Sequence, residues 1–158
     1  MKRFLLLAAL LVLILGSCSN YKNIDIVGAE IKDVKILSPL KYQVDLMVEV
    51  DNPSGTKFTV SGVEGLVLKD GKPFAEALVK GEMVIPARGV NGILVSCAIS
   101  LKDPLSALAL GLNYKSLNWD SFTIDARGTI KGGPVKKKLD FKGIPARRLY
   151  NYVKRKME

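Results

Sequence analysis

Hydrophobic and polar residues alternate along most of the chain with a period of two. Residues 41–51 show this clearly: the apolar side chains fall on one face, the polar ones on the other, and only Met47 is out of phase. A period of two predicts a β-strand with one buried and one exposed face. The same pattern predicts strands over residues 24–37, 58–68, 75–85, 93–101, 122–131 and 135–142.

Turn-forming residues separate these predicted strands. Asn52-Pro53-Ser54-Gly55 ends one strand, Asp70-Gly71 predicts a tight hairpin, and Pro86 ends the strand that returns from it. Gly62 lies where the parity of the apolar positions changes, which predicts a β-bulge. A kink is expected in the first strand near Gly28.

Two segments have helical spacing instead. Asp103-Pro104 is typical of a helix start, and leucines follow it at helical intervals to Leu112. Beyond Pro145, one face of a predicted amphipathic helix carries Ala146, Leu149, Tyr150, Val153 and Met157. About seven strands with only these two helices predict an all-β immunoglobulin- or fibronectin III-like β-sandwich with a short connecting helix and a C-terminal amphipathic helix.

The N-terminus breaks the alternation. Lys2-Arg3 precedes an unbroken apolar run over residues 4–15, and Leu15-Gly16-Ser17-Cys18 follows. This arrangement resembles a bacterial lipoprotein signal with its lipobox. The apolar run is shorter than the roughly 20 residues that a membrane span needs. The predicted organisation is a signal peptide (1–17), a lipidated tether (18–23), a sandwich domain (24–143) and a basic C-terminal helix (144–158).

The resemblance implies that Cys18 becomes the first mature residue and carries a diacylglyceryl group, which anchors the protein to a membrane. Ser19 resembles the residue that sorts lipoproteins to the outer membrane, facing the periplasm. The alternative is a cleaved secretory signal with an incidental cysteine. Because residues 19–23 reach only roughly 15 Å at 3.3–3.6 Å per residue, an anchored domain would lie close to its membrane.

Positive charge gathers at the C-terminus. The whole chain has a net charge of +9, and residues 131–158 hold ten basic residues against Asp140 and Glu158. One hypothesis is that this tail binds anionic lipid or an acidic envelope partner through its basic residues, which are Arg147, Arg148, Lys154, Arg155 and Lys156. The alternative is that the helix packs its apolar stripe on its own sandwich and leaves the charges solvated.

Strand geometry bears on where this tail lies. If seven strands run simply up and down, the last strand ends opposite the start of the first. A helix of about 13 residues returns only about 20 Å. This geometry predicts a tail that points away from the anchoring membrane, towards cell wall or a partner.

Residues for catalysis are scarce. The chain has no histidine, which removes the commonest general base and metal ligand. Asp45, Glu49 and Asp51 alternate along one exposed strand face, where a solvated role is expected rather than a carboxylate pair or a calcium site. Cys97 falls on a core face and is expected to be a buried, inert thiol. We therefore expect no enzyme, cofactor or metal, and no nucleic-acid partner.

An ordered series of short motifs resembles a known family. Val48-Glu49-Val50-Asp51-Asn52-Pro53 is similar to the strand-then-Asn-Pro signature of type 2 late embryogenesis abundant proteins, also called the water-stress and hypersensitive-response domain. Later pieces match in order, over residues 69–72, 85–89, 125–128 and 139–143. The motif positions are Asn52, Pro53, Gly71, Pro86 and Gly128, and for Asn52 and Pro86 a role as strand terminators competes with direct ligand contact.

This resemblance implies a fibronectin-like sandwich, an association with desiccation or other stress, and no catalytic site. The first hypothesis for function is therefore a membrane-anchored protective or interaction module in the cell envelope that contacts client proteins or envelope components. The alternative is an electrostatic docking lipoprotein that uses its basic C-terminal helix.

Overall fold

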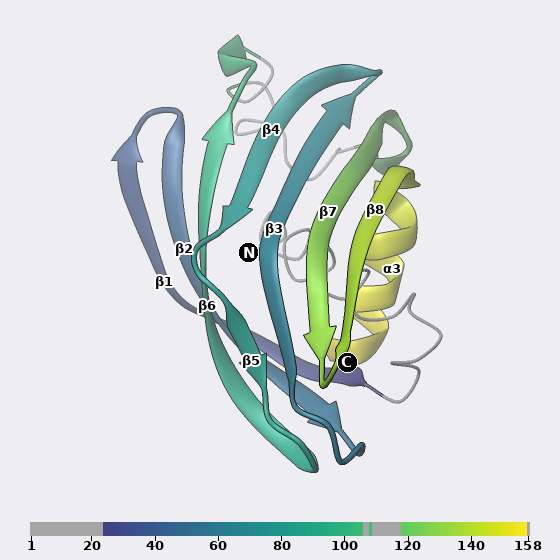
Figure 1. Cartoon of the computed structure of the whole chain (residues 1–158). Helices are drawn as coiled ribbons and strands as arrows, with labels where there is room; N and C mark the ends of the chain where they lie inside the picture. The colour runs from purple at the N-terminus through teal and green to yellow at the C-terminus, as the bar shows by residue number, and fades with distance from the viewer. Residues whose placement is uncertain (1–23, 106–107, 109–117, 158) are drawn as a thin grey trace.

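The computed structural model describes residues 24–105, 108 and 118–157. Strands make up most of these residues (Figure 1). The elements are β1 (Asp25–Ser38), β2 (Lys41–Asn52), β3 (Phe58–Lys69), β4 (Lys72–Val79), β5 (Met83–Ile85), β6 (Gly89–Leu101), a 3-10 turn η3 (Trp119–Ser121), β7 (Phe122–Gly132), β8 (Val135–Pro145) and α3 (Ala146–Met157).

All strand pairs are antiparallel, and their order is β1-β2-β6-β4-β3-β7-β8, with β5 also paired to β3. The half β1-β2-β6 faces the half β3-β7-β8, and β4 joins the two because it pairs with both β3 and β6 (Figure 1). The structure is thus the predicted all-β, sandwich-like fold. The sheet is continuous along one side, at β4.

The inward faces of both halves form the core. The largest fully buried side chains include Ile85, Ile124, Ile130, Val44 and Val48. These residues occupy alternate positions of their strands, as the period of two predicts. Burial of so many branched side chains supplies the main stabilisation of the fold.

The C-terminal helix packs on β7 and β8 and meets the start of β1. Ala146 and Leu149 are buried, at 0% and 3% exposure, and pack with Phe122, Ile124 and Ala126 of β7. At the far end of α3, the Tyr152 hydroxyl donates to the Asp25 carboxylate at 3.2 Å. The helix therefore links the start of β1 to the half of the sheet that contains β7.

The sandwich has two ends, the Asn52 end and the Gly71 end. The Asn52 end holds the starts of β1, β3, β6 and β8 and the ends of β2, β5 and β7. Register places these together, since Asp25 pairs with Asp51, Asn52 with Gly89, and Phe58 with both Ile85 and Gly132. The Gly71 end holds the turn between β3 and β4 and the end of β8 (Figure 1).

Two differences from the predicted strands stand out. The strand predicted to return from the hairpin over residues 75–85 is divided into β4 and β5, which makes eight strands. Its apolar positions remain in phase across the break, and the division falls at Gly81, whose φ is 72°. Of the predicted connecting helix, Pro104, Leu105 and Leu108 are helical, and the rest lies outside the described residues.

The predicted irregularities are confirmed. The register of β3 against β7 shifts between Ser61 and Glu64, around Gly62, whose φ is 60°. The register of β1 shifts between Ile26 and Gly28. At the tight hairpin, Asp70 and Gly71 both have positive φ, of 49° and 78°, as a two-residue hairpin turn requires.

Candidate functional site

Asn52 is the one polar side chain that is fully buried among the described residues, with 0% exposure. Its amide nitrogen donates to the carbonyl oxygens of Thr56 and Pro86, each at 2.9 Å. Its side-chain oxygen accepts from the backbone N–H of Ser54 at 3.1 Å and from the Ser54 hydroxyl at 2.7 Å. These four bonds use every donor and acceptor site of the side-chain amide.

Asn52 thereby ties two connections of the sandwich together. The loop between β2 and β3 and the turn between β5 and β6 meet at this residue, and Arg88 adds a backbone bond to the Ser54 carbonyl at 3.0 Å. The bond from Asn52 to Pro86 joins two motif positions that are 34 residues apart in sequence. Because no hydrogen-bonding site of Asn52 is left over, its geometry fits a structural clasp rather than ligand contact.

The other motif positions have backbone roles. Pro53 is exposed in the loop after β2, Gly71 lies in the tight hairpin, and Gly128 lies on the buried face of β7 opposite Leu139. Only Asn52 and Pro86 come together; Gly71 lies at the opposite end of the sandwich.

The five basic residues of the helix that were predicted to bind a lipid or partner differ in their surroundings. Arg148, Lys154 and Arg155 are exposed on α3. Arg147 is exposed too, but its guanidinium forms an ion pair with Asp120 at 2.6 Å. Lys156 belongs to α3, and its side chain lies outside the described part of the chain.

The apolar side of α3 is already occupied by the protein itself. Leu149 is buried against β7, and the Tyr150 ring stacks on Trp119 with centroids 5.0 Å apart. Leu149 and Tyr150 both contact the sandwich, so neither side chain is free to insert into a membrane. Packing of the helix on its own domain, the alternative expectation, is what the structure has.

The predicted direction of the tail also needs correction. The last strand does end opposite the start of β1, but α3 then runs back, and Tyr152 reaches Asp25. The physical reason is that β1 begins beside the C-terminal end of α3 before crossing to the far side of the sheet (Figure 1). The helix therefore ends next to the strand that follows the predicted tether.

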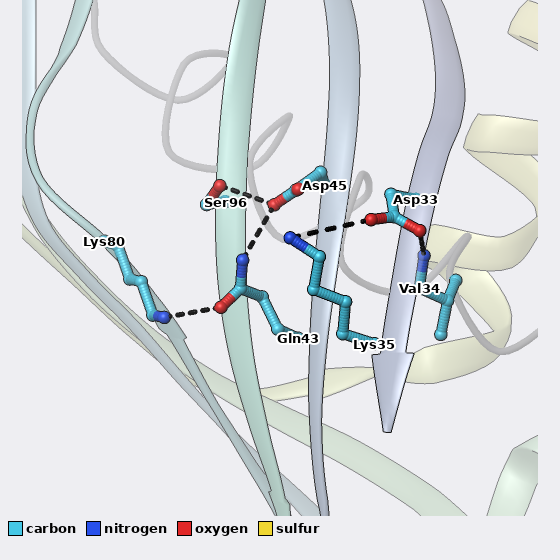
Figure 2. A network of polar contacts seen from close by, with 7 residues as sticks. All are labelled: Asp33, Val34, Lys35, Gln43, Asp45, Lys80 and Ser96. Atoms are coloured by element: carbon cyan, nitrogen blue, oxygen red, sulfur yellow. Dashed lines mark hydrogen bonds and ion pairs between the residues drawn. The ribbon is translucent and has the colours of Figure 1, made fainter. Parts of the chain in front are cut away.

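The outer face of β1, β2 and β6 carries a polar network (Figure 2). Asp45 accepts hydrogen bonds from the Ser96 hydroxyl and the Gln43 amide, and Lys80 donates to Gln43 at 2.7 Å. The Ser96 bond, helped by Gln43 and by the charges of Lys35 and Lys80, lowers the pKa of Asp45 below its ordinary value. This face is exposed, so the network belongs to the solvated strand face that the alternation predicts.

Replacing Ser96 by alanine should raise the pKa of Asp45, because it removes the largest influence on that pKa. Because the pKa of Asp45 is lowered, the stabilisation of the folded state by the hydrogen bonds of its carboxylate is present above the ordinary pKa of aspartate. This stabilisation is lost as the pH falls through the lowered value. A side-chain carbon NMR titration measures the change directly. Ser100→Ala, on the same face of β6, is the matched control, and an equal shift there would contradict the assignment to Ser96.

Cys97 lies on the buried face of β6 with 2% exposure. Burial, with a smaller influence from the charge of Asp45, raises the pKa of its thiol to about 11. A thiol that is both buried and protonated at neutral pH is a poor nucleophile. Its position confirms the prediction of a buried cysteine.

The Cys97 thiol should therefore react at least about 100-fold more slowly with a disulfide reagent in native buffer than in denaturant, since both access and ionisation are suppressed. Because the folded pKa exceeds the unfolded one, its contribution to stability is present below the ordinary pKa and is lost as the pH rises towards about 11. The reaction rates in native buffer and in denaturant are measured in a Cys18→Ser variant, in which Cys97 is the only thiol. A native rate equal to the denatured rate would contradict it.

The described residues contain neither a metal-binding cluster nor a helix that could cross a membrane. No group of three or more Cys, Asp or Glu side chains in residues 24–105, 108 and 118–157 is placed to hold a metal ion. Within the same ranges, no helix combines the length and apolar character that crossing a bilayer requires. Cys18 and Ser19, which carry the lipoprotein prediction, lie outside the described part.

Comparisons with known proteins assign no family. No family model matches the chain, and no curated protein is significantly similar. Solved structures with a similar arrangement include a protein from Archaeoglobus fulgidus (9% identity, 75% of this chain and 97% of the other, TM-score 0.45). A family 2 glycoside hydrolase, a β-glucuronidase, matches over 75% of this chain but 11% of its own (13% identity, TM-score 0.35).

A third similar structure is a solution structure of a protein described as late embryogenesis abundant. It is 11% identical, with 91% of each chain covered and a TM-score of 0.32. All three TM-scores lie below 0.5, so these similarities carry no conclusion about activity or partners.

Proposed function

We propose that this chain is a lipid-anchored lipoprotein of the cell envelope whose β-sandwich is a non-catalytic protective or interaction module. The observation that carries the proposal is Leu15-Gly16-Ser17-Cys18, which follows a basic start and an apolar run and stands a few residues before Asp25, where β1 begins. Two or more acyl chains on Cys18 would hold the domain firmly at a membrane.

The polar side chains of the sandwich support a role without catalysis. The whole chain lacks histidine, the hydrogen-bonding sites of buried Asn52 are all used, and the Cys97 thiol is buried. General acid–base or nucleophilic catalysis needs a group that can reach a substrate and exchange a proton with it. Asn52 and Cys97 therefore serve the fold.

The stress-related part of the proposal rests on the ordered motifs that resemble type 2 late embryogenesis abundant proteins. In this role, the exposed strand faces make weak contacts with client proteins or envelope components during water loss. Ser19, next to the lipidated cysteine, favours the periplasmic side of the outer membrane as the place where this happens.

Lipid anchoring is tested by growing cells with radioactive palmitate. The protein should become labelled and should sediment with membranes, whereas the Cys18→Ser variant should lose the label and its lipid anchor. Cys97→Ser is the matched control because the structure buries that thiol. A wild-type protein without label would contradict the proposal.

The protective role is tested separately by drying a labile reporter enzyme with the mature protein. The reporter should retain more activity than with an inert β-sandwich of equal size at the same concentration. Equal loss of activity in the two samples would remove protection from the proposal while leaving the anchor intact.

A second candidate is electrostatic docking through the basic helix, favoured by Arg148 and Arg155, which are exposed on α3. Because Leu149 is packed internally, charge alone would drive this binding. Arg148→Gln/Arg155→Gln should then weaken salt-sensitive sedimentation with anionic vesicles more than Lys69→Gln/Lys72→Gln at the β3–β4 hairpin. Identical, salt-insensitive sedimentation of all three proteins would rule docking out.

A further inference from the structure

Basic side chains gather at the Asn52 end of the sandwich. They come from three connections that are distant in sequence, namely the β2–β3 loop, the β5–β6 turn and the β7–β8 hairpin. Strand pairing brings these together, since Phe58 pairs with both Ile85 and Gly132. The exposed basic residues are Lys57, Arg88, Lys131, Lys136 and Lys137. These five residues are called the basic end below.

Among residues 24–105, 108 and 118–157, no acidic side chain forms an ion pair with the basic end. The ion pairs between described residues all lie elsewhere and involve none of these five side chains. The acidic residues near this end are Asp25, Asp51 and Glu82, and Asp25 accepts the hydrogen bond from Tyr152. Basic charge therefore exceeds acidic charge here.

The opposite end of the molecule is different. There Lys102 pairs with Glu76 at 2.9 Å, and Arg147 pairs with Asp120 at 2.6 Å. Exposed basic residues occur at both ends, but these two at the Gly71 end have acidic partners. Part of the basic charge at the Gly71 end is therefore paired within the described part of the chain, whereas none of the five side chains of the basic end is.

Arg88 supports a role for this charge beyond the fold. Its φ is 58°, in the left-handed region that an L-residue with a Cβ adopts at a steric cost. Glycine would occupy this position without that cost, yet the chain places an exposed cation there. Its backbone N–H bonds to Ser54, an interaction that glycine could make equally well.

We propose that the basic end faces the membrane that carries the Cys18 anchor and binds its anionic lipid headgroups. This inference rests on the proposed lipid anchor. The strand that follows the tether begins at this end, where Asp25 pairs with Asp51, and the tether of residues 19–23 is short. The anchor therefore holds the basic end, rather than the Gly71 end, next to the headgroups.

The number of basic residues sets how strongly the basic end is attracted to anionic headgroups. Each basic residue near an anionic membrane surface strengthens binding by about fivefold, and the attraction fades within a Debye length of about 8 Å at physiological salt. Five such residues held by a short tether would fix the orientation of the domain. The Gly71 end would then point away from the lipid.

Protection of a sheet edge is a competing explanation for part of this charge. Lysines on an edge strand discourage pairing with other chains, and Lys136 and Lys137 lie on the edge strand β8. That explanation does not extend to Lys57 and Arg88, which lie in a loop and a turn and not on an edge.

The orientation can be measured on the lipidated protein reconstituted into vesicles. A fluorophore on a new cysteine, Val135→Cys, reports on the basic end, because Val135 is exposed beside the β7–β8 turn and is uncharged. Lys72→Cys reports on the opposite end, and buried Cys97 should stay unlabelled. The quencher is a nitroxide on the lipid headgroup, in phosphatidylcholine vesicles with or without phosphatidylglycerol.

The probe at residue 135 should be quenched at least about twofold more in vesicles that contain phosphatidylglycerol, and 1 M salt should remove the difference. The probe at residue 72 should be quenched little in either vesicle. Equal quenching at residue 135 in the two vesicles, or stronger quenching at residue 72, would overturn the proposal. A protein that floats with neither vesicle would instead contradict the lipid anchor itself.

The chain offers a matched pair of charge variants. Lys131 and Lys136 lie directly opposite each other near one hairpin, and Lys69 and Lys72 do so at the other. In the Val135→Cys background, Lys131→Gln/Lys136→Gln should lose most of the additional quenching, whereas Lys69→Gln/Lys72→Gln should keep it. Equal losses in the two variants would show that net charge, not the basic end, governs binding.

Discussion

Replacing Asn52 by aspartate should destabilise the sandwich by about 4 kcal/mol at neutral pH. The amide nitrogen of Asn52 donates to the carbonyl oxygens of Thr56 and Pro86 at 2.9 Å, and a carboxylate oxygen there would repel both. The site is fully buried, so water cannot replace the lost donors. Because the free energy of unfolding of a domain is only about 5–15 kcal/mol, this substitution removes a large part of it.

Denaturant unfolding of the Asn52→Asp variant measures this loss, and its pH dependence provides a second check. Burial and the two carbonyls should raise the pKa of the new carboxyl above its unfolded value. The variant is therefore least destabilised at acidic pH, where the new carboxyl is protonated. It becomes less stable as the pH rises from the unfolded pKa through the raised pKa of the folded state. Asn151→Asp, at an exposed position of α3, should cost less than about 0.5 kcal/mol. Equal losses of stability at the two positions would contradict the role of the Asn52 hydrogen bonds in joining the β2–β3 loop to the β5–β6 turn.

Replacing Leu149 by alanine should cost about 3 kcal/mol, because the side chain is 3% exposed and packs α3 onto β7. The change should also loosen the stacking of Tyr150 on Trp119, the single tryptophan of the chain. We therefore expect both a lower unfolding midpoint and a red shift of the tryptophan emission in the native state.

Leu94→Ala is the control, since Leu94 is 61% exposed on β6, and its cost should stay below about 0.5 kcal/mol. The comparison decides between two roles for the apolar face of α3. If Leu149→Ala left stability unchanged but weakened vesicle binding, the face would serve a membrane and not the sandwich.

The strands could be predicted from the sequence wherever one face is buried and the other is solvated. In β2 and β7 nearly every side chain follows this alternation, so the pattern alone locates the strand and its inward face. The bulge at Gly62 was also predictable, because an extra residue in a strand reverses the parity of apolar positions.

The division between β4 and β5 could not be predicted in the same way. Val79, Met83 and Ile85 are all buried and all odd-numbered, so the alternation continues through the break. Only Gly81 marks the change of direction, and a lone glycine within an alternating run is a weak signal. Likewise, no local pattern predicts that β4 pairs with both halves of the sheet.

The candidate site was predictable as a set of residues, but not as a geometry. The sequence indicates a turn at Asn52, and a local side-chain bond follows from that. The bond to Pro86 depends on how two loops meet 34 residues apart. The basic end was not predicted from the sequence, because Lys57, Arg88 and Lys131 lie at one end of the sandwich only through the pairing of β3 with β5 and β7.

The contact between Tyr152 and Asp25 has a consequence for how this chain reaches its folded state. The two residues are 127 positions apart, so the loop that this contact closes contains almost the whole domain. Contacts of such high sequence separation form late and slow the folding rate. In an exported chain, as proposed above, α3 can dock only after its own residues have left the translocation channel. Truncation within α3 should therefore yield a protease-sensitive intermediate with both edge strands accessible, even where every strand is present.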